Sequence, residues 1–117
     1  MARYRLYHNP RCSKSRAALA LLEQRGITPE VVLYLETPPD VETLRSLVTA
    51  LGLSHPAQLL RTKEDDYQAA GLSADSDAEQ VLAAMAAYPR LIERPLLVHG
   101  ARAVIGRPTE NLLDLLE

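Results

Sequence analysis

The sequence is poor in cysteine, with Cys12 alone among 117 residues. One cysteine cannot form a disulfide within the chain, which excludes the disulfide-stapled class of small secreted domains. There is also no run of about 18 apolar residues, the minimum for a helix that spans a membrane. The first residues, "MARYRLYH", lack the apolar core of a secretory signal. We therefore expect a cytoplasmic protein with no membrane partner.

Excess positive charge is missing as well, since the formal net charge is -2. Proteins whose main partner is a nucleic acid usually present a strongly basic face, so we expect no nucleic-acid partner. Lysine is scarce, with 2 Lys against 11 Arg. Two interpretations stay open: a GC-rich genome favours Arg codons, or some of the arginines form planar donor forks for an oxyanion.

The residues that are present predict one α/β domain over residues 1–117, because a chain of this length buries about two thirds of its unfolded surface in a single core. Residues 2–8 alternate and predict a strand, and Ser13 to Arg25 predict a helix that ends at Gly26. The apolar run "EVVLYLE", residues 30–36, predicts a second strand that is buried on both faces. These elements form a βαβ unit, for which we expect a right-handed crossover.

The middle of the chain is predicted to be helical. A helix follows Thr37 as its N-cap, with Asp40 at the capping-box position, and short helical turns are expected over residues 55–72. Another helix carries a capping box of Ser76 and Glu79. After it, "PLLVHGARAVIG" predicts a β-hairpin and "RPTENLLDLLE" an amphipathic helix.

Without its middle helices the predicted order is βαβ-ββα. This is the order of the thioredoxin-like fold, with a mixed sheet. The sequence therefore predicts a thioredoxin-like α/β fold with a helical insertion at about residues 37–88.

Cys12 lies between the first predicted strand and the first predicted helix, where free backbone N–H groups and the helix dipole favour a thiolate. Positive side chains surround it, and serines can donate hydrogen bonds to the anion: Arg11, Lys14, Arg16, Ser13 and Ser15. A buried structural cysteine is the alternative, but inert cysteines have apolar neighbours, so we favour a reactive thiol. His8 either tunes the thiol pKa or is simply packed. Because "CSKS" lacks a second cysteine, any redox cycle needs an external thiol.

Five segments in order, "YHNPRCSKSR", "LYLETPP", "LLRTKEDDY", "ERPLLV" and "IGRPTE", resemble the ArsC-type arsenate reductases that use glutathione and glutaredoxin. The resemblance covers nearly the whole chain and is closest to a shorter, arsenate-reductase-like branch of that family. It implies a thioredoxin-like fold with a large helical insertion. Where the best-known members have glycine and threonine after the cysteine, this chain has Ser13 and Lys14.

The resemblance implies a role for each matching residue. Cys12 would attack the arsenic of arsenate, and three arginines would bind the oxyanion: Arg61, Arg94 and Arg107. Ser15 would hydrogen-bond the sulfur, and His8 and Arg16 would help to set its pKa or bind substrate. Pro95 lies where thioredoxin-like folds keep a cis-proline beside the active cysteine. Three guanidinium groups are suited to a tetrahedral anion because they are planar and always charged.

The function expected from this resemblance is a cytoplasmic oxidoreductase of arsenic detoxification, which reduces arsenate to arsenite through a Cys12 adduct. Glutathione would be the external reductant and glutaredoxin the protein partner, with no bound cofactor or metal, and we expect a monomer. One alternative is a thiol-disulfide oxidoreductase that acts on glutathione mixed disulfides. Another is a non-enzymatic redox-linked regulator of the same superfamily, although such regulators usually use a Cys-x-x-Cys pair.

Overall fold

The computed structural model describes residues 4–116 and contains two compact units. The first unit is formed by the chain up to Thr37 and from Arg94 onward, and the second by Pro38–Glu93. The predicted helical insertion, about residues 37–88, covers nearly the same stretch of chain as this second unit. That the whole chain acts as one domain stays a prediction.

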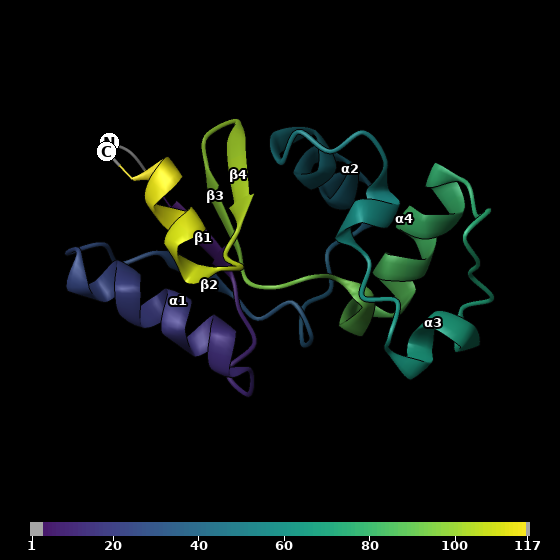
Figure 1. Ribbon diagram of the computed structural model, residues 1–117, viewed down its shortest axis with the longest axis horizontal. Coiled ribbons are helices and arrows are strands. Elements are labelled where there is room, and N and C mark those ends of the chain that lie inside the picture. Colours follow the sequence, from purple (N-terminus) through teal and green to yellow (C-terminus); the bar gives the residue numbers. More distant parts are fainter. Residues whose placement is uncertain (1–3, 117) are drawn as a thin grey trace. The chain divides into compact units, whose positions relative to one another are not determined.

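The first unit is built on a four-stranded mixed sheet with the order β2-β1-β3-β4. Its elements are β1 (Tyr4–Tyr7), α1 (Ser13–Gln24), β2 (Glu30–Val32), β3 (Leu96–His99), β4 (Arg102–Ile105) and the 3-10 helix η3 (Thr109–Leu115). β1 pairs in parallel with β2, as a βαβ unit requires, and antiparallel with β3. β3 and β4 form the predicted hairpin. Figure 1 shows these strands with α1 and the yellow η3 beside them.

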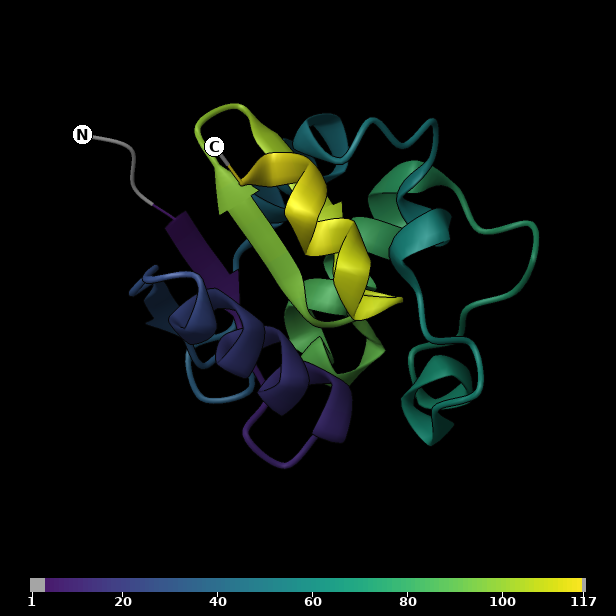
Figure 2. The ribbon, with the colours of Figure 1, turned by 60° about the vertical axis from the view of Figure 1, so that its left-hand side comes forward.

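One face of this sheet is covered by α1 and η3, which also contact each other (Figure 2). Alternate residues of β1 point into this layer, so Tyr4 and Leu6 are buried there while Arg5 is exposed. The apolar side chains that meet in this layer come from four elements: Tyr4, Leu6, Ala18, Leu22, Leu97, Leu112 and Leu115. Their burial stabilises the frame that carries the Cys12 loop and the β4–η3 loop.

The second unit is helical. It contains α2 (Val41–Ala50), η1 (Pro56–Leu59), α3 (Asp65–Ala69), α4 (Ala78–Ala87) and η2 (Pro89–Leu91). α4 packs on α2 and η1, and the Arg45 guanidinium joins α2 to α4 through two bonds to the Glu79 carboxylate, at 2.7 and 2.9 Å. Leu60, directly after η1, and Ile92, directly after η2, form an isolated antiparallel bridge within this unit.

Four local predictions were wrong, and three of them concern β2 and α2. The run of residues 30–36 is a strand only over β2, and Leu33–Glu36 form a turn. β2 is an edge strand with Val31 42% exposed, so its apolar character does not reflect burial on both faces. The α2 N-cap is Asp40 rather than Thr37, because the Asp40 carboxylate accepts from the Thr43 N–H at 2.8 Å.

The capping box of α4 is likewise shifted by one residue, to Asp77 and Gln80 instead of Ser76 and Glu79. The α1 helix, the short turns of residues 55–72 and the hairpin formed as predicted. With the sheet order and the helices of the first unit, the predicted thioredoxin-like α/β fold is confirmed. Among residues 4–116 no helix combines the length and the apolarity needed to span a membrane. The cytoplasmic location stays a prediction.

Candidate active site

The candidate site is built on the loop that joins β1 to α1. β1 ends at Tyr7, and two residues later the Asn9 carbonyl accepts from the Cys12 N–H at 3.0 Å, which closes a tight turn. Cys12 is the N-cap of α1 and has extended backbone angles, φ -96 and ψ 124. Its carbonyl accepts the first bond of the helix from the Arg16 N–H. The half-buried sulfur is therefore held at the positive end of a 12-residue helix.

Opposing effects act on the pKa of the Cys12 thiol. Partial burial is the largest single effect and raises the pKa, because it disfavours the anion. Hydrogen bonds from the backbone N–H groups of Ser15 and Lys14, with the charge and hydrogen bond of Arg94, act in the other direction and together outweigh burial. The pKa of Cys12 is therefore lowered. A lowered pKa distinguishes a reactive thiol from an inert buried one.

Two arginines come to the sulfur from the other end of the chain. Arg107 lies 95 positions after Cys12, and its Nη2 donates to Cys12 Sγ at 3.7 Å. The Nε of the same guanidinium donates to the Arg94 carbonyl at 2.7 Å. The planar Arg107 guanidinium thus bridges Cys12 Sγ and the Arg94 carbonyl. The positive charge of Arg94 also favours the Cys12 thiolate.

The backbone between these arginines brings them together. The peptide bonds Arg94–Pro95 and Arg107–Pro108 are both cis, and the cis form at Pro95 is as expected. The Pro95 carbonyl accepts from the Gly106 N–H at 2.9 Å. A Cβ at Gly106 would lie 2.9 Å from Pro95 Cγ and 3.2 Å from Leu112 Cδ2, so only glycine permits this approach. The segments just before β3 and just after β4, which carry Arg94 and Arg107, are therefore in close contact.

His8, directly after β1, and Ser15, in the first turn of α1, form a buried pair. His8 is 5% exposed and Ser15 is fully buried. His8 Nδ1 lies 2.6 Å from Ser15 Oγ, which also accepts from the Asn9 N–H at 2.9 Å. Burial, and secondly the charge of Arg16, lower the pKa of His8, so its ring is neutral at pH 7. A neutral Nδ1 can accept the Ser15 hydroxyl proton, and this pair ties the end of β1 to the first turn of α1.

These contacts bear on the expected roles of Ser15 and Arg16. The backbone N–H of Ser15 donates to the Cys12 sulfur. The Ser15 hydroxyl instead contacts His8 Nδ1 and the Asn9 N–H. Arg16 is exposed and donates to the Pro10 carbonyl at 2.9 Å, so it braces the loop. The catalytic and binding roles themselves stay predictions.

Arg61 belongs to the second unit. The backbone N–H of Arg61 donates to the Leu91 carbonyl. Its guanidinium lies 3.3 Å from the Arg90 carbonyl and 3.5 Å from the Glu64 carboxylate. The side chain is therefore held by its own unit. Its predicted contact with the oxyanion stays a prediction.

The sequence interpretation did not single out Gly106 or Asn111. Asn111 Nδ2 donates to the Ile105 carbonyl at 3.2 Å and to the Arg107 carbonyl at 3.0 Å. The spacing of four residues between Arg107 and Asn111, with Pro108 between them, is the signal that could have indicated this bond. Within residues 4–116, no three His, Cys, Asp or Glu side chains are grouped as metal ligands would be.

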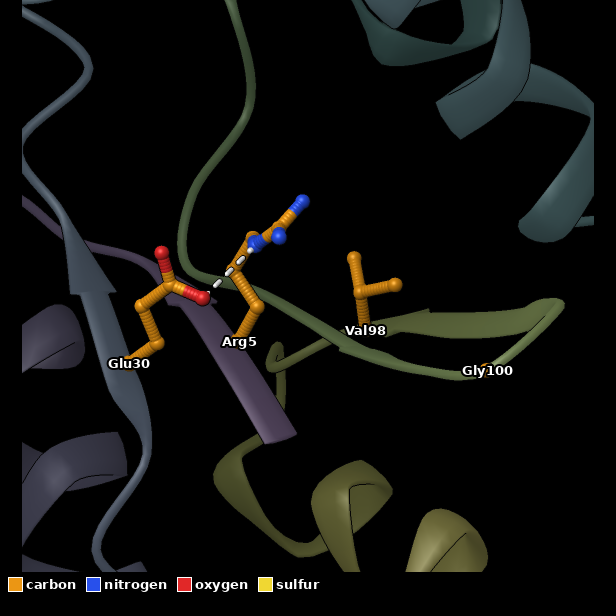
Figure 3. A pocket seen from close by; sticks show the side chains of 4 residues that line it. All are labelled: Arg5, Glu30, Val98 and Gly100. Carbon is orange, nitrogen blue, oxygen red and sulfur yellow. Dashed lines mark hydrogen bonds and ion pairs between the residues drawn. The ribbon is translucent and has the colours of Figure 1, made fainter. Parts of the chain in front are cut away.

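A pocket on the sheet is lined by Arg5, Glu30, Val98 and Gly100 (Figure 3). Arg5 Nε donates to Glu30 Oε1 at 3.4 Å, and the Glu30 charge raises the pKa of Arg5. Both side chains are about half exposed, so the pair contributes little stability. None of the predicted site residues lines this pocket, and its one arginine is neutralised by Glu30.

Comparison with known proteins agrees with this fold. The model of the ArsC family matches residues 7–115. An arsenate reductase of Neisseria meningitidis is 47% identical over 117 residues, which cover 99% of this chain and all of that protein. An arsenate reductase of Haemophilus influenzae is 42% identical over 112 residues, covering 95% of this chain and 97% of that protein. A solved arsenate reductase from Vibrio cholerae superposes with a TM-score of 0.94 at 46% identity, with 98% of each chain covered. The chain belongs to the ArsC family.

Proposed function

We propose that this protein is an oxidoreductase that reduces arsenate to arsenite, with glutathione and glutaredoxin supplying the electrons. The observation that carries the proposal is the placement of Arg107 Nη2 3.7 Å from Cys12 Sγ, beside a thiol whose pKa is lowered. A thiolate next to fixed guanidinium donors is suited to attack on a tetrahedral oxyanion, because the donors offset charge that the attack adds. Relatives named arsenate reductases, at 42% and 47% identity, support arsenate as that oxyanion.

In the first step the Cys12 thiol and dihydrogen arsenate form an S–As bond. One arsenate oxygen leaves as water with two protons, one from the thiol and one from arsenate. Arsenic stays As(V) in this adduct. Arg94 and Arg107 neutralise the negative charge of the thiolate and the oxyanion as they approach each other.

Two thiols then supply two electrons. The glutathione thiol attacks the Cys12 sulfur, the S–As bond breaks, and its electron pair stays on arsenic, which leaves as arsenite. Cys12 and glutathione are now joined by a disulfide. A glutaredoxin thiolate attacks the glutathione sulfur and releases Cys12. The sum is arsenate, glutathione and a glutaredoxin thiol going to arsenite, water and a glutathione–glutaredoxin disulfide.

The direct test is arsenite release by the purified protein, with glutathione and glutaredoxin each present or omitted. We expect release that needs both, and none from Cys12→Ser, because a hydroxyl is a far weaker nucleophile than a thiolate. Circular dichroism of the variant controls for folding.

Two outcomes would contradict the proposal. Arsenite release by folded Cys12→Ser would place the chemistry elsewhere. Reduction of a glutathione mixed disulfide without arsenite release would favour the thiol-disulfide oxidoreductase instead.

A further inference from the structure

We infer that Asn111 is a positioning residue for the oxyanion site, acting through Arg107. The inference rests on the proposed function, since it assigns Asn111 to the same site. Asn111 lies in η3 and is partly buried. It is too far along the chain from Cys12 to be recognised by sequence proximity, and its side-chain bonds go to backbone rather than to the sulfur.

The two bonds of Asn111 hold the backbone on both sides of Gly106. Nδ2 donates to the Ile105 carbonyl, at the end of β4, and to the Arg107 carbonyl, at 3.2 and 3.0 Å. An Asn amide has two N–H donors, so both bonds can form at once. The Asn111 N–H also donates to the Pro108 carbonyl at 3.0 Å, which fixes the residue that carries the amide.

Arg107 needs this support because its side chain must meet two partners together. Nε is on the Arg94 carbonyl at 2.7 Å while Nη2 reaches Cys12 Sγ at 3.7 Å. A planar guanidinium satisfies both only when its Cα is correctly placed and oriented. Gly106 limits that placement from the Pro95 side, and Asn111 limits it from the η3 side. Without the amide, the Arg107 peptide can turn and its guanidinium loses the second partner.

The experiment measures protection of Cys12 from iodoacetamide by arsenate, without reductants, in the full-length chain. The readout is the arsenate concentration that halves the alkylation rate. For Asn111→Ala we expect this concentration to rise about five- to thirtyfold, the range that corresponds to loss of one or two ordinary hydrogen bonds. Asn111→Asp should do the same or worse, because carboxylate oxygens would face two carbonyl oxygens.

A double-mutant cycle separates positioning from general loosening. If Asn111 acts through Arg107, Asn111→Ala has no further effect on protection in the Arg107→Ala background. Leu113→Ala, an exposed apolar residue of the same helix, is the matched control and should leave protection unchanged. Thermal unfolding of every variant confirms that each is folded at the assay temperature.

Four results of these experiments would overturn the inference. Unchanged protection in Asn111→Ala, or an equal effect in both backgrounds, overturns the inference while the proposed function stands. Loss of protection in Leu113→Ala as well would also overturn it, because the effect would follow the helix and not the amide. No protection of the wild-type protein by arsenate would overturn the proposed oxyanion site, and this inference with it.

Discussion

At the scale of the residue, Arg107 is the side chain whose geometry matters most. Its guanidinium bridges the Arg94 carbonyl and the Cys12 sulfur. We expect Arg107→Ala and Arg94→Ala to lower kcat/KM for arsenate by roughly a hundredfold or more, the usual effect of removing one donor to a developing oxyanion. Arg107→Lys should recover little, because an ammonium is a point charge that cannot span both partners.

Steady-state kinetics with circular dichroism makes this measurement. Arg25→Ala is a suitable control, since Arg25 is an exposed arginine at the C-terminal end of α1. Wild-type kcat/KM in both folded site variants would rule out an oxyanion role for these arginines.

His8 shows how burial decides a question that sequence left open. Its pKa is lowered below the usual 6.5, first by burial and then by Arg16. The unfolded chain therefore binds a proton at a higher pH than the folded protein does. Stability from neutral His8 is present above about pH 6.5 and is lost as pH falls through the folded pKa.

We predict that the free energy of unfolding of the wild-type protein falls more between pH 7 and pH 5.5 than that of His8→Asn. An Asn oxygen can replace Nδ1 as acceptor for Ser15 but does not titrate. Urea unfolding of both proteins at the two pH values measures the difference, because the two proteins differ only at position 8. Equal losses in the two proteins would mean that the burial of His8 is not coupled to its protonation.

At the scale of the element, the type and order of the elements could be predicted, but their ends could not. The α4 stripe of apolar residues is clear, whereas three consecutive polar residues, Asp75, Ser76 and Asp77, all suit an N-cap. The structure selects Asp77, whose carboxylate accepts from the Gln80 N–H while Gln80 Oε1 accepts from the Asp77 N–H, both at 2.8 Å. Ser76 instead accepts from the Ser73 N–H in the preceding turn.

This difference gives a stability prediction. Asp77→Ala should destabilise the protein by about 1 kcal/mol, the ordinary cost of a lost N-cap. Ser76→Ala should cost clearly less, because it removes a bond in the loop and leaves the helix end capped. Urea denaturation measures the free energy of unfolding of both variants. A larger loss of this free energy for Ser76→Ala than for Asp77→Ala would contradict the observed capping box.

The prediction of a doubly buried strand over residues 30–36 was wrong for a different reason. An apolar run does not show by its composition whether the strand is at the edge or in the centre of a sheet. It does not show where the strand ends either, since the run from Val31 to Leu35 lies partly in β2 and partly in a turn. Strand order depends on the return of β3 beside β1, which is a long-range pairing. Local patterns do not contain that information.

At the scale of the whole molecule, the site depends on the same long-range pairing. Cys12 was identified from its neighbours in sequence, and Arg94 and Arg107 only by resemblance to a family. The bridge made by the Arg107 guanidinium and the support given by Asn111 could not be predicted, since both depend on how the β3–β4 hairpin and η3 return to the Cys12 loop. Arg61 lies in the helical unit, so its role rests on resemblance alone.

The central claim is that Cys12 is an activated thiolate within an oxyanion site. Its most direct test is the rate of iodoacetamide alkylation of the wild-type protein against pH, with and without arsenate. Only the thiolate reacts appreciably, so the midpoint reports the pKa, and no second cysteine complicates the signal. Because the pKa of Cys12 is lowered, we predict a midpoint below the free-thiol value near 8.5, and slower alkylation when arsenate is present. A midpoint at or above about 8.5, with no protection by arsenate, would contradict the account.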